Sequence, residues 1–526
     1  MTQSLRHAKL GFTFARMFSF PPENLLTFVA PGFFGDLTGH IYWGRGYLWE
    51  MTVFVGTSGL LLAATALLDR EHRRAARIDL IMAAVLLLIA LGSNTPLFHL
   101  LYNGVPGFDR FRGMSKFTFP ALIFLVLAIG RGADALIRRR LPLPELAACA
   151  LQAGAALAIA GAVLRAHPEF LAGFLALVQK TNESYLAHDA FTNHAFLRDV
   201  GVPAGQSLIW AGLALLLAGA GLACARRRPS LRWVPLLVLA LEMMAFAGTH
   251  FATAHATQAV LPIGLKSYVD ARPGDYRVLN PQDPDNGYFL GKPDIWGNDP
   301  SPLTRYAEFM TYTQGGDPDK LSQNLDFHIF PRVYTMLRFR YAFLPGADGI
   351  QIAEQVAKPM PRAQLISDYR VLYGRDQMLA MLGSAYFDPR QTVLLESVPY
   401  PRPVPNPDPG TVKVVASSTD DLTVEAVVNR PTLLLITDLF SNNWRARPLA
   451  GSVQKIYTIM PANYILRAIP LNAGRHRIRI EYVPGGFRLG MAVSFVAWLL
   501  WFGILCWHAS AAKRAGAGFS PAAWFP

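Results

Sequence analysis

Residues 31–50 bring together side chains that can take part in acid–base chemistry, directly before an apolar run. The segment reads PGFFGDLTGHIYWGRGYLWE, so Asp36, His40 and Glu50 can serve as acid, base or ligand, although their spacing matches no metal-binding motif. Irregular backbone near a membrane must be held by protein or line a wet cavity, which favours a functional surface. The alternative is a structural turn whose aromatic residues form an interfacial belt. The residues predicted to line a substrate pocket are Asp36, His40, Tyr42, Trp43, Arg45 and Glu50.

A second group of side chains suits the binding of a lipid phosphate. The sequence FDRFRGMSK, before a long apolar run, contains Arg110, Arg112 and Lys116. Guanidinium groups make bidentate contacts with phosphate oxygens, and basic residues outside a membrane oppose the usual topological bias. The same residues can instead extend to the headgroup region or pair with the adjacent Asp109.

Isolated residues in predicted strands and spans complete the candidates. Trp444, in SNNWRARP, follows a predicted strand and can either stack on a sugar ring or close the end of a β-sandwich. Glu242 lies in the apolar run LVLALEMMAF, where an unpaired carboxylate costs on the order of 2–3 kcal/mol, so it should face the helix bundle. It either lines a cavity or, as its position near the outer end favours, reaches the interface. Arg131 and Asp134 are spaced i, i+3 and are expected to pair with each other.

Composition identifies the chain as a membrane protein. Hydrophobic residues make up 52% of the 526 residues and charged residues 16%, and mean hydropathy is +0.25. Several runs approach the roughly 20 apolar residues that cross a bilayer. Walker, GxSxG and HExxH motifs are missing from the sequence, so ATP-driven transport and hydrolase chemistry have no support. The seven predicted spans are residues 49–68, 78–95, 117–137, 146–164, 206–224, 231–248 and 487–508.

Charge predicts the orientation of these spans. Short basic clusters follow every second span, and such clusters mark cytoplasmic connections. The N-terminus is therefore predicted outside, together with residues 31–50, 96–116 and 249–486. Because the large outer region is nearly neutral, the net charge of +13 belongs mainly to the membrane half and does not indicate nucleic-acid binding. The clusters are Arg70, Arg73, Arg74 and Arg77; Arg138–Arg140; Arg226–Arg228; and Lys513 with Arg514.

The predicted fold is a polytopic α-helical membrane protein with an extracytoplasmic α+β region that ends in a jelly-roll-like β-sandwich. From residue 391 the sequence alternates with period two in TVLLESV, TVKVVAS, LTVEAVV, TLLLITD, YILRAIPL and HRIRIEYV. Before it, Arg375–Leu382 is a predicted short helix. The predicted domains are 1–48, an outer juxtamembrane segment; 49–248, six membrane helices; 249–390, a mixed α/β region; 391–486, the sandwich; 487–508, the last span; and 509–526, a cytoplasmic tail.

The run LLITDLFSNNWRARPLAGSVQKIYTIMPANYILRAIPLNAGRHRIRIEYVPGGFRLG resembles the C-terminal signature of the bacterial YfhO-like membrane proteins. PENLLTFVAPGFFGDLTGHIYWG, FDRFRGMSKF, DYRVLN and GKPDIWGNDPSPLTRYAEF resemble the same family in the same order. The resemblance implies a GT-C-type glycosyltransferase architecture in the bacterial cytoplasmic (inner) membrane. It also implies transfer of a sugar from a polyprenyl-phosphate donor to a cell-envelope acceptor on the outer face.

The chain departs from the GT-C pattern at its start, because no span precedes residue 49 to carry the N-terminus outside. We therefore expect a C-terminal portion of a longer protein, or one half of a split pair with an N-terminal partner chain. The family's catalytic acid would then lie elsewhere, so no catalytic residue is assigned. A divalent metal stays open as cofactor without a ligand motif. The alternative is a non-catalytic membrane protein whose outer β-sandwich binds glycan or scaffolds a partner.

Overall fold

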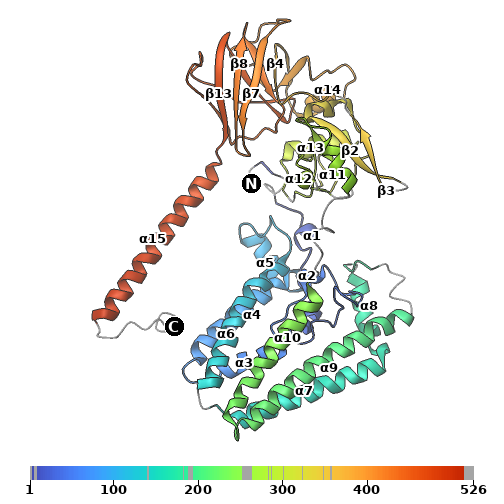
Figure 1. Cartoon of the computed structure of the whole chain (residues 1–526), viewed down its shortest axis with the longest axis vertical. Coiled ribbons are helices and arrows are strands. Elements are labelled where there is room, and N and C mark those ends of the chain that lie inside the picture. Colours follow the sequence, from blue (N-terminus) through green and yellow to red (C-terminus); the bar gives the residue numbers. More distant parts are fainter. Residues whose placement is uncertain are drawn as a thin grey trace. The chain divides into compact units, whose positions relative to one another are not determined.

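The computed structural model describes the chain except for residues 1–2, 5–8, 139–140, 182, 187–193, 252–262, 282–283, 286, 300, 323, 347–348, 356–357 and 515–526 (Figure 1). The chain forms two compact units. We call them the helical unit, Ala8–Ala254, and the β-rich unit, Met1–His7 with His255–Phe525. Two of the predicted basic residues, Arg139 and Arg140, and most of the predicted tail 509–526 lie outside the described residues.

Long apolar helices place the chain in the membrane class. Five helices in the described residues are long and apolar enough to cross a bilayer: Met114–Arg138, Leu143–Ala166, Ala195–Cys224, Pro229–His250 and Gly485–Trp507. They coincide with five of the predicted spans. The second predicted span corresponds to α4, whose first turns carry several charges, so a total of seven stays a prediction. The longer helices of the helical unit are α3 Thr57–Ala66, α4 Arg73–Ala90, α5 Leu97–Gly104, α6 Thr118–Arg138, α7 Leu143–Ala166, α8 Ala172–Thr181, α9 His194–Cys224 and α10 Val234–His250.

Short helical turns complete this unit. Three of them precede α3 in the segment that carries the predicted pocket residues. They are α1 Phe12–Ala15, η2 Pro22–Phe28 and α2 Leu48–Met51, followed later in the chain by η3 Gly92–Asn94, η4 Met114–Phe117, η5 Pro168–Leu171 and η7 Pro229–Trp233.

The predicted span 49–68 is interrupted instead of forming one helix. The chain makes α2, leaves helical geometry at Thr52, and resumes as α3 after Gly56. Ten helical residues extend about 15 Å, roughly half of a bilayer core. Gly56 has φ +82°, and a Cβ there would lie 2.2 Å from Cδ1 of Leu239 in α10. Both requirements favour glycine at the break, which leaves the N-terminus of α3 beside α10.

Glycines allow the membrane helices to approach closely. A Cβ on Gly161 of α7 would lie 2.5 Å from the carbonyl oxygen of Gly205 in α9, and one on Gly154 would lie 2.8 Å from that of Gly212. In α6, a Cβ on Gly132 would lie 1.7 Å from a carbonyl oxygen of α3. Small residues at helix crossings are the packing expected where lipid gives no hydrophobic drive between helices.

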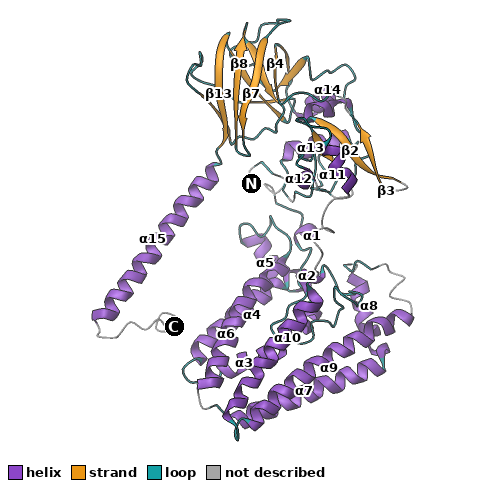
Figure 2. Ribbon diagram, in the orientation of Figure 1, coloured by secondary structure: helices purple, strands orange, loops and turns teal. Residues whose placement is uncertain are grey.

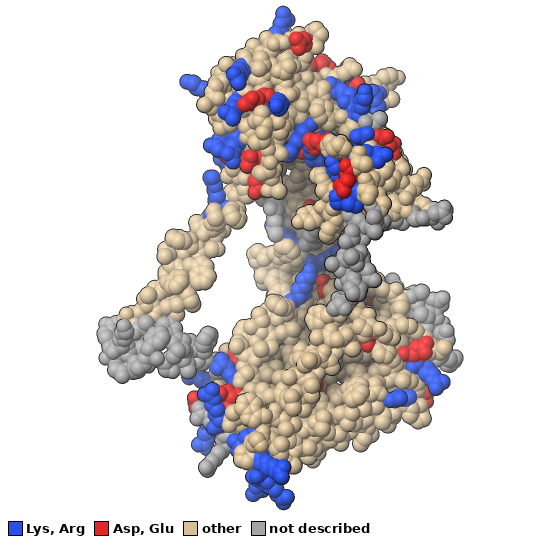
Figure 3. Space-filling view, viewed as in Figure 1, with Lys and Arg blue, Asp and Glu red and all other residues tan. Residues whose placement is uncertain are grey.

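The predicted pair of Arg131 with Asp134 is wrong. Nε of Arg131 instead lies 2.8 Å from Oδ2 of Asp79 in α4. Asp134 pairs with Arg138 at 2.7 Å and approaches Nε2 of His72 at 3.6 Å. These contacts bring the α3–α4 connection to the C-terminal end of α6. Figure 3 shows Lys and Arg side chains gathered at the lower left of the helical unit, next to a surface that is mostly uncharged.

Three sheets form the β-rich unit (Figure 2). Their orders are β1-β2-β3, β10-β13-β8-β7 and β4-β9-β12-β11-β6-β5. All six predicted strands are confirmed, as is the helix Arg375–Leu382. Because β4 and β5 precede residue 391, the six-stranded sheet begins before the predicted sandwich boundary. The strands are β1 Arg277–Leu279, β2 Phe339–Gly346, β3 Gly349–Glu354, β4 Ala363–Ile366, β5 Asp368–Val371, β6 Thr392–Leu395, β7 Gly410–Ser417, β8 Asp421–Val428, β9 Thr432–Ile436, β10 Trp444–Pro448, β11 Met460–Ala462, β12 Leu466–Leu471 and β13 Gly474–Tyr482.

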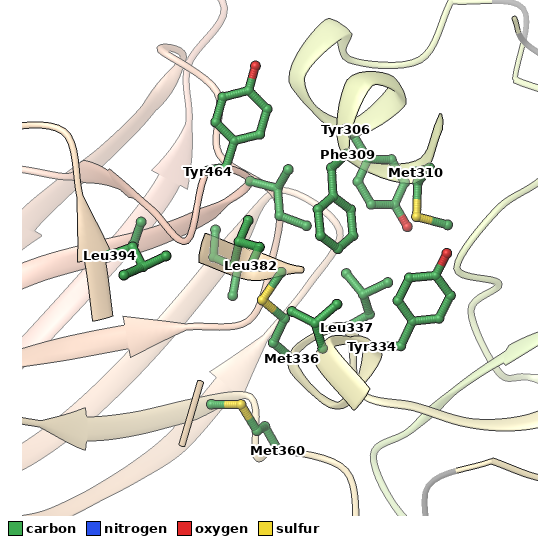
Figure 4. Packing of buried hydrophobic residues seen from close by; sticks show 14 of the residues in the cluster. Tyr306, Phe309, Met310, Tyr334, Met336, Leu337, Met360, Leu382, Leu394 and Tyr464 are labelled. Carbon is green, nitrogen blue, oxygen red and sulfur yellow. The ribbon is translucent and has the colours of Figure 1, made fainter. Parts of the chain in front are cut away.

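The six-stranded sheet is covered on both faces. On one face, Val424 of β8 and Ile480 of β13 share a buried cluster with Ile436 and Ile469, so the two larger sheets pack together. The other face packs against helices in a second cluster that includes Phe309, Met336, Leu382 and Leu394 (Figure 4). Double coverage explains why β9, TLLLI, is buried throughout instead of alternating. A jelly-roll connectivity stays a prediction. The helices of this unit are α11 Ile263–Asp270, α12 Gly287–Leu290, α13 Thr304–Thr313, η8 Arg332–Leu337, α14 Arg375–Leu382 and α15 Gly485–Arg514.

The helix α15 follows the last strand and carries apolar side chains on all sides. None of the span Gly485–Trp507 is buried within the chain, and Trp498 and Trp501 are exposed. A helix that is apolar all round requires an apolar environment, which a lipid bilayer supplies.

Candidate functional site

A cavity of about 630 Å³ in the helical unit contains two of the predicted pocket residues, Asp36 and His40. It lies between α9, α10, the start of α3 and the segment that runs from Val29 to His40. The volume is within the range of small-molecule sites. The predicted segment therefore does contribute to a cavity, although most of the cavity wall comes from α9 and α10.

Asp36 and His40 form a hydrogen-bonded carboxylate–imidazole pair at the cavity. Oδ1 of Asp36 accepts the backbone N–H groups of Thr38 and Gly39, each at 2.8 Å, and that of His40 at 3.2 Å. Oδ2 of Asp36 lies 2.6 Å from Nδ1 of His40. The sequence DLTGH thus folds into a tight turn around its own aspartate, as aspartate favours.

Electrostatics keeps this carboxylate ionised. Partial burial by itself would raise the pKa of Asp36, but the hydrogen bonds from His40 and the three N–H groups outweigh it and lower the pKa to about 2. The His40 side chain is 51% exposed, and no described residue forms a hydrogen bond with its Nε2. A carboxylate on Nδ1 fixes the tautomer that leaves Nε2 free to accept a proton.

The C-terminal end of α10 anchors this turn. The backbone N–H of Leu37 donates to the carbonyl oxygen of Thr249 at 3.1 Å. Nε2 of His250 lies 3.3 Å from the carbonyl oxygen of Pro31, and its Nδ1 lies 2.8 Å from Oγ1 of Thr249. The His250 ring also stacks on Phe246 with centroids 4.4 Å apart. These contacts hold the Asp36–His40 pair at one end of the cavity.

Glu242 caps the broken helix and lines the same cavity. Its Oε1 accepts the N–H of Thr57 at 2.8 Å, and its Oε2 accepts the N–H of Ser58 at 3.0 Å and the Ser58 hydroxyl. Helix N-termini attract carboxylates because their first N–H groups lack helical partners. Of the two predicted roles, lining a cavity is the one the structure supports.

The cavity is polar at one end and apolar at the other. Because α9 and α10 are joined by a short connection, with Gly221 packed on Val234, they run antiparallel. The middle of α9, with Gln206 and Ser207, is therefore level with Thr249 and His250. Two turns along α10 from that end lies Glu242, and the wall beyond it is apolar. This far wall includes Leu213, Leu217, Val238 and Leu241.

The remaining residues of the predicted pocket have structural contacts and do not line the cavity. Trp43 is completely buried against Phe33 and Phe34. The Tyr42 hydroxyl donates to the carbonyl oxygen of Arg45 at 2.9 Å, and burial raises the pKa of Tyr42. Arg45 is 8% exposed and pairs with Glu23 at 3.2 Å and with Glu183 at 2.8 Å. These residues hold the segment in place.

Glu50 and the predicted phosphate-binding residues belong to a second region. Oγ of Ser115 lies 3.4 Å from Oε2 of Glu50, so the two predicted segments meet here. The Arg112 guanidinium packs over the rings of Phe14 and Phe18, at 4.7 and 5.3 Å. Arg110 lies 4.0 Å from Asp109, and Lys116 is exposed. Lipid-phosphate binding by Arg110, Arg112 and Lys116 stays a prediction.

Trp444 lies in the β-rich unit, half-buried at the start of β10. The Arg467 guanidinium covers one face of its ring at 3.9 Å, and Tyr482 meets it edge-on with centroids 5.2 Å apart. The ring lines a separate cavity of about 450 Å³. The prediction that it stacks on a sugar is untested.

Sequence reasoning missed Gln206, Ser207, Thr249 and His250, which line the polar end of the cavity. The available signal was the group of polar residues at facing ends of two apolar runs. Among the residues the structure describes, no group of three or more His, Cys, Asp or Glu side chains is placed to hold a metal ion. Comparison of the chain with protein-family models, curated proteins and solved structures finds no match.

Proposed function

We propose that this chain is an integral-membrane glycosyltransferase, or the acceptor-binding part of one. In this proposal the cavity holds a hydroxyl-bearing cell-envelope amphiphile, and His40 removes the proton of the hydroxyl that receives the sugar. The sugar comes from a polyprenyl-phosphate donor, as the resemblance to YfhO-like proteins implies. The observation that carries the proposal is the Asp36–His40 pair at the polar end of an otherwise apolar cavity.

The walls of the cavity fit a lipid-like molecule. Apolar side chains of the cavity lining are exposed on the protein surface, with Trp210 at 64%, Leu217 at 60% and Leu241 at 57%. In a bilayer these residues face acyl chains, so an amphiphile can enter sideways with its tail in lipid. Its head then lies beside the pair formed by Asp36 and His40.

The charges of the cavity favour an acceptor over the phosphate of a donor. Its lining carries the carboxylates Asp36 and Glu242, and lysine and arginine are missing from the described lining residues. Arg165, outside the lining, donates to Oε1 of Gln206. A phosphate would meet two carboxylates there, whereas a sugar or lipid hydroxyl meets hydrogen-bonding groups.

The chemical step requires one base in the cavity. The acceptor hydroxyl gives its proton to Nε2 of His40 as its oxygen bonds to the anomeric carbon of the donor sugar. The bond from that carbon to the phosphate oxygen breaks, and the polyprenyl phosphate leaves with the electron pair. Asp36 stabilises the imidazolium that forms.

The positive-inside rule supports an extracytoplasmic position for this chemistry. The first turns of α4, the connection that precedes α10 and the end of α6 carry the arginine clusters. If that end is cytoplasmic, the C-terminal end of α10 and the Asp36–His40 pair lie towards the outer face of the inner membrane.

Transfer assays with substituted chains test the proposal. Membranes that contain the full chain are incubated with radiolabelled polyprenyl-phosphate sugars, and the glycolipids are extracted and counted. Loss of a general base slows transfer by about a hundredfold to ten-thousandfold, so His40→Gln and Asp36→Asn should fall in this range. His167→Gln is the matched control, because His167 pairs with Glu169 at 2.9 Å outside the cavity.

Two results would contradict the proposal. If the His40→Gln variant transfers sugar at the rate of the control, His40 is not the general base. The membranes in this assay supply cell-envelope acceptors and any partner chain. If no polyprenyl-phosphate sugar is transferred in them, the chain is not a glycosyltransferase of this kind.

A further inference from the structure

The β-rich unit contains a cluster of four arginines around one aspartate. Asp438 lies two residues after β9, the second strand of the six-stranded sheet, and is 6% exposed. Arg362 precedes β4 and Arg467 lies in β12, the two strands that flank β9 in the sheet. Arg277 begins β1, and Arg338 follows η8. The sheet topology therefore brings arginines from separate parts of the chain together around Asp438.

The carboxylate of Asp438 is within 3.4 Å of a nitrogen of each of the four guanidinium groups. Its Oδ1 lies 2.7 Å from Nη2 of Arg338 and 3.0 Å from Nη2 of Arg277. Its Oδ2 lies 2.9 Å from Nε of Arg362 and 3.4 Å from Nη2 of Arg467. Each carboxylate oxygen thus already faces two cations, and further cationic donors must find partners elsewhere.

The cluster holds more positive than negative charge. The other carboxylate in contact is Asp275, which pairs with Arg338 at 2.7 Å but is itself 61% exposed. Asp299 also lines the adjoining cavity. Four arginines against three aspartates leave a surplus cation. Burial and the repulsion between guanidinium groups lower the pKa of Arg467 to about 10, although Asp438 acts in the opposite direction.

Several buried guanidinium nitrogens have no hydrogen-bond partner among the described residues. They are Nη1 of Arg467, Nε of Arg338 and Nε of Arg277. The Arg467 side chain is 3% exposed, and this residue lines the cavity of about 450 Å³ beside the cluster. A buried charged donor without an acceptor is costly, and an anionic ligand in the cavity supplies the missing acceptor.

Other lining residues of this cavity suit a carbohydrate. Trp444 and Tyr482 line it together with the hydroxyl-bearing Ser441 and Thr419. Aromatic rings beside hydroxyl groups match the apolar faces and hydroxyls of a sugar ring. The Arg467 guanidinium lies over the Trp444 ring, 3.9 Å from its centroid, so the unpaired donor and the aromatic wall are adjacent.

From this geometry we propose that the arginine cavity beside Trp444 binds a sugar that carries an oxyanion, either a carboxylate or a phosphate. The oxyanion receives the free guanidinium donors, with Arg467 as the buried anchor and Arg362 at the more exposed edge, where its side chain is 24% exposed. The sugar ring lies against Trp444 and Tyr482. This site is independent of the glycosyl transfer proposed for the helical unit.

Binding measurements on the full chain in lipid nanodiscs test this site. Glucuronate and glucose 1-phosphate are the acidic probes, glucose is the neutral probe, and inorganic phosphate reports on a plain anion site. Both acidic sugars should bind more tightly than glucose and phosphate, and the binding should weaken as salt is added. Arg362→Gln and Arg467→Lys should each raise the Kd by about tenfold or more.

Arg447→Gln is the matched control, because Arg447 lies in β10, the strand that carries Trp444, and forms a surface pair with Glu481 at 3.3 Å outside the cavity lining. Its Kd values should equal those of the unsubstituted chain. Arg362→Gln keeps the test valid if Arg467→Lys fails to fold. Equal binding of glucose and glucuronate, or of phosphate and glucose 1-phosphate, would overturn the proposal, as would no binding of either acidic sugar.

Discussion

Replacement of Glu242 by alanine tests the packing that creates the cavity of the helical unit. The carboxylate joins the middle of α10 to the first turn of α3 through two backbone N–H groups and the Ser58 hydroxyl. With alanine, the N–H groups of Thr57 and Ser58 lose their acceptor. Because α3 starts after a break, no preceding helical turn can replace it.

The expected loss of unfolding free energy follows from these bonds. Each hydrogen bond to a charged acceptor contributes about 1.5–3 kcal/mol, and each N–H left without a partner costs about 1–3 kcal/mol. Water in the cavity recovers part of this, so we expect a loss of about 3 kcal/mol. Glu242→Gln keeps one acceptor oxygen and should lose about half as much. For a unit of this size, 3 kcal/mol corresponds to a Tm lower by roughly 6–12 °C.

Thermal unfolding followed by circular dichroism in detergent measures this loss. Glu145→Ala is the control, because Glu145 is an exposed carboxylate in the first turn of α7. Such an exposed interaction with a helix dipole contributes about 0.3–1 kcal/mol. If Glu242→Ala unfolds at the same temperature as the control, Glu242 does not hold α3, and the cavity geometry described above is wrong.

Three more substitutions test other contacts of the helical unit. Gly132→Ala places a Cβ 1.7 Å from a carbonyl oxygen of α3 and should lower the Tm strongly, whereas Gly130→Ala has nothing within 4 Å and should leave it unchanged. Arg45→Ala leaves the buried carboxylate of Glu23 unpaired and should cost about 3–5 kcal/mol of unfolding free energy in denaturant titration. Arg138→Ala, at a side chain that is 74% exposed, should cost less than about 1 kcal/mol. The lowered pKa of Asp36 means that its contribution is complete above the usual value of 3.8 and is lost as pH falls towards 2. Hydrogen exchange of the turn should therefore stay slow in mildly acidic buffer and accelerate in strong acid, and Asp36→Asn should accelerate it at neutral pH.

The local hydrophobic pattern of the sequence predicted most of the helices and strands. It failed where contacts with residues distant in the chain determine the structure. The alternation of LTVEAVV predicts β8 because one face is buried and the other is not. AQLI and DYRV, the strands β4 and β5, are too short to show a period. The hydropathy of 49–68 predicts one span, but the break depends on Glu242, far along the chain. Arg131 finds Asp79 on a neighbouring helix, which spacing along one helix does not reveal.

The candidate site shows the same division between local and distant information. The turn DLTGH holds its own carboxylate, so the pairing of Asp36 with His40 can be predicted from residues four apart. The roles of Trp43 and Arg45 depend on partners such as Phe34 and Glu183. The sequence alone does not indicate these contacts. Aromatic and charged residues in a short segment indicate importance, but burial decides whether they bind a ligand or each other.

The two cavities differ in the charge of the side chains that line them. A helix N-terminus is an anion site, but Glu242 already occupies the one at α3, which leaves the cavity of the helical unit without a free feature for phosphate. The cavity beside Arg467 has the opposite balance, with buried donors that lack acceptors. The two proposed sites therefore differ in the charge of the ligand that each would accept. In both, the side chains that line the cavity set this preference.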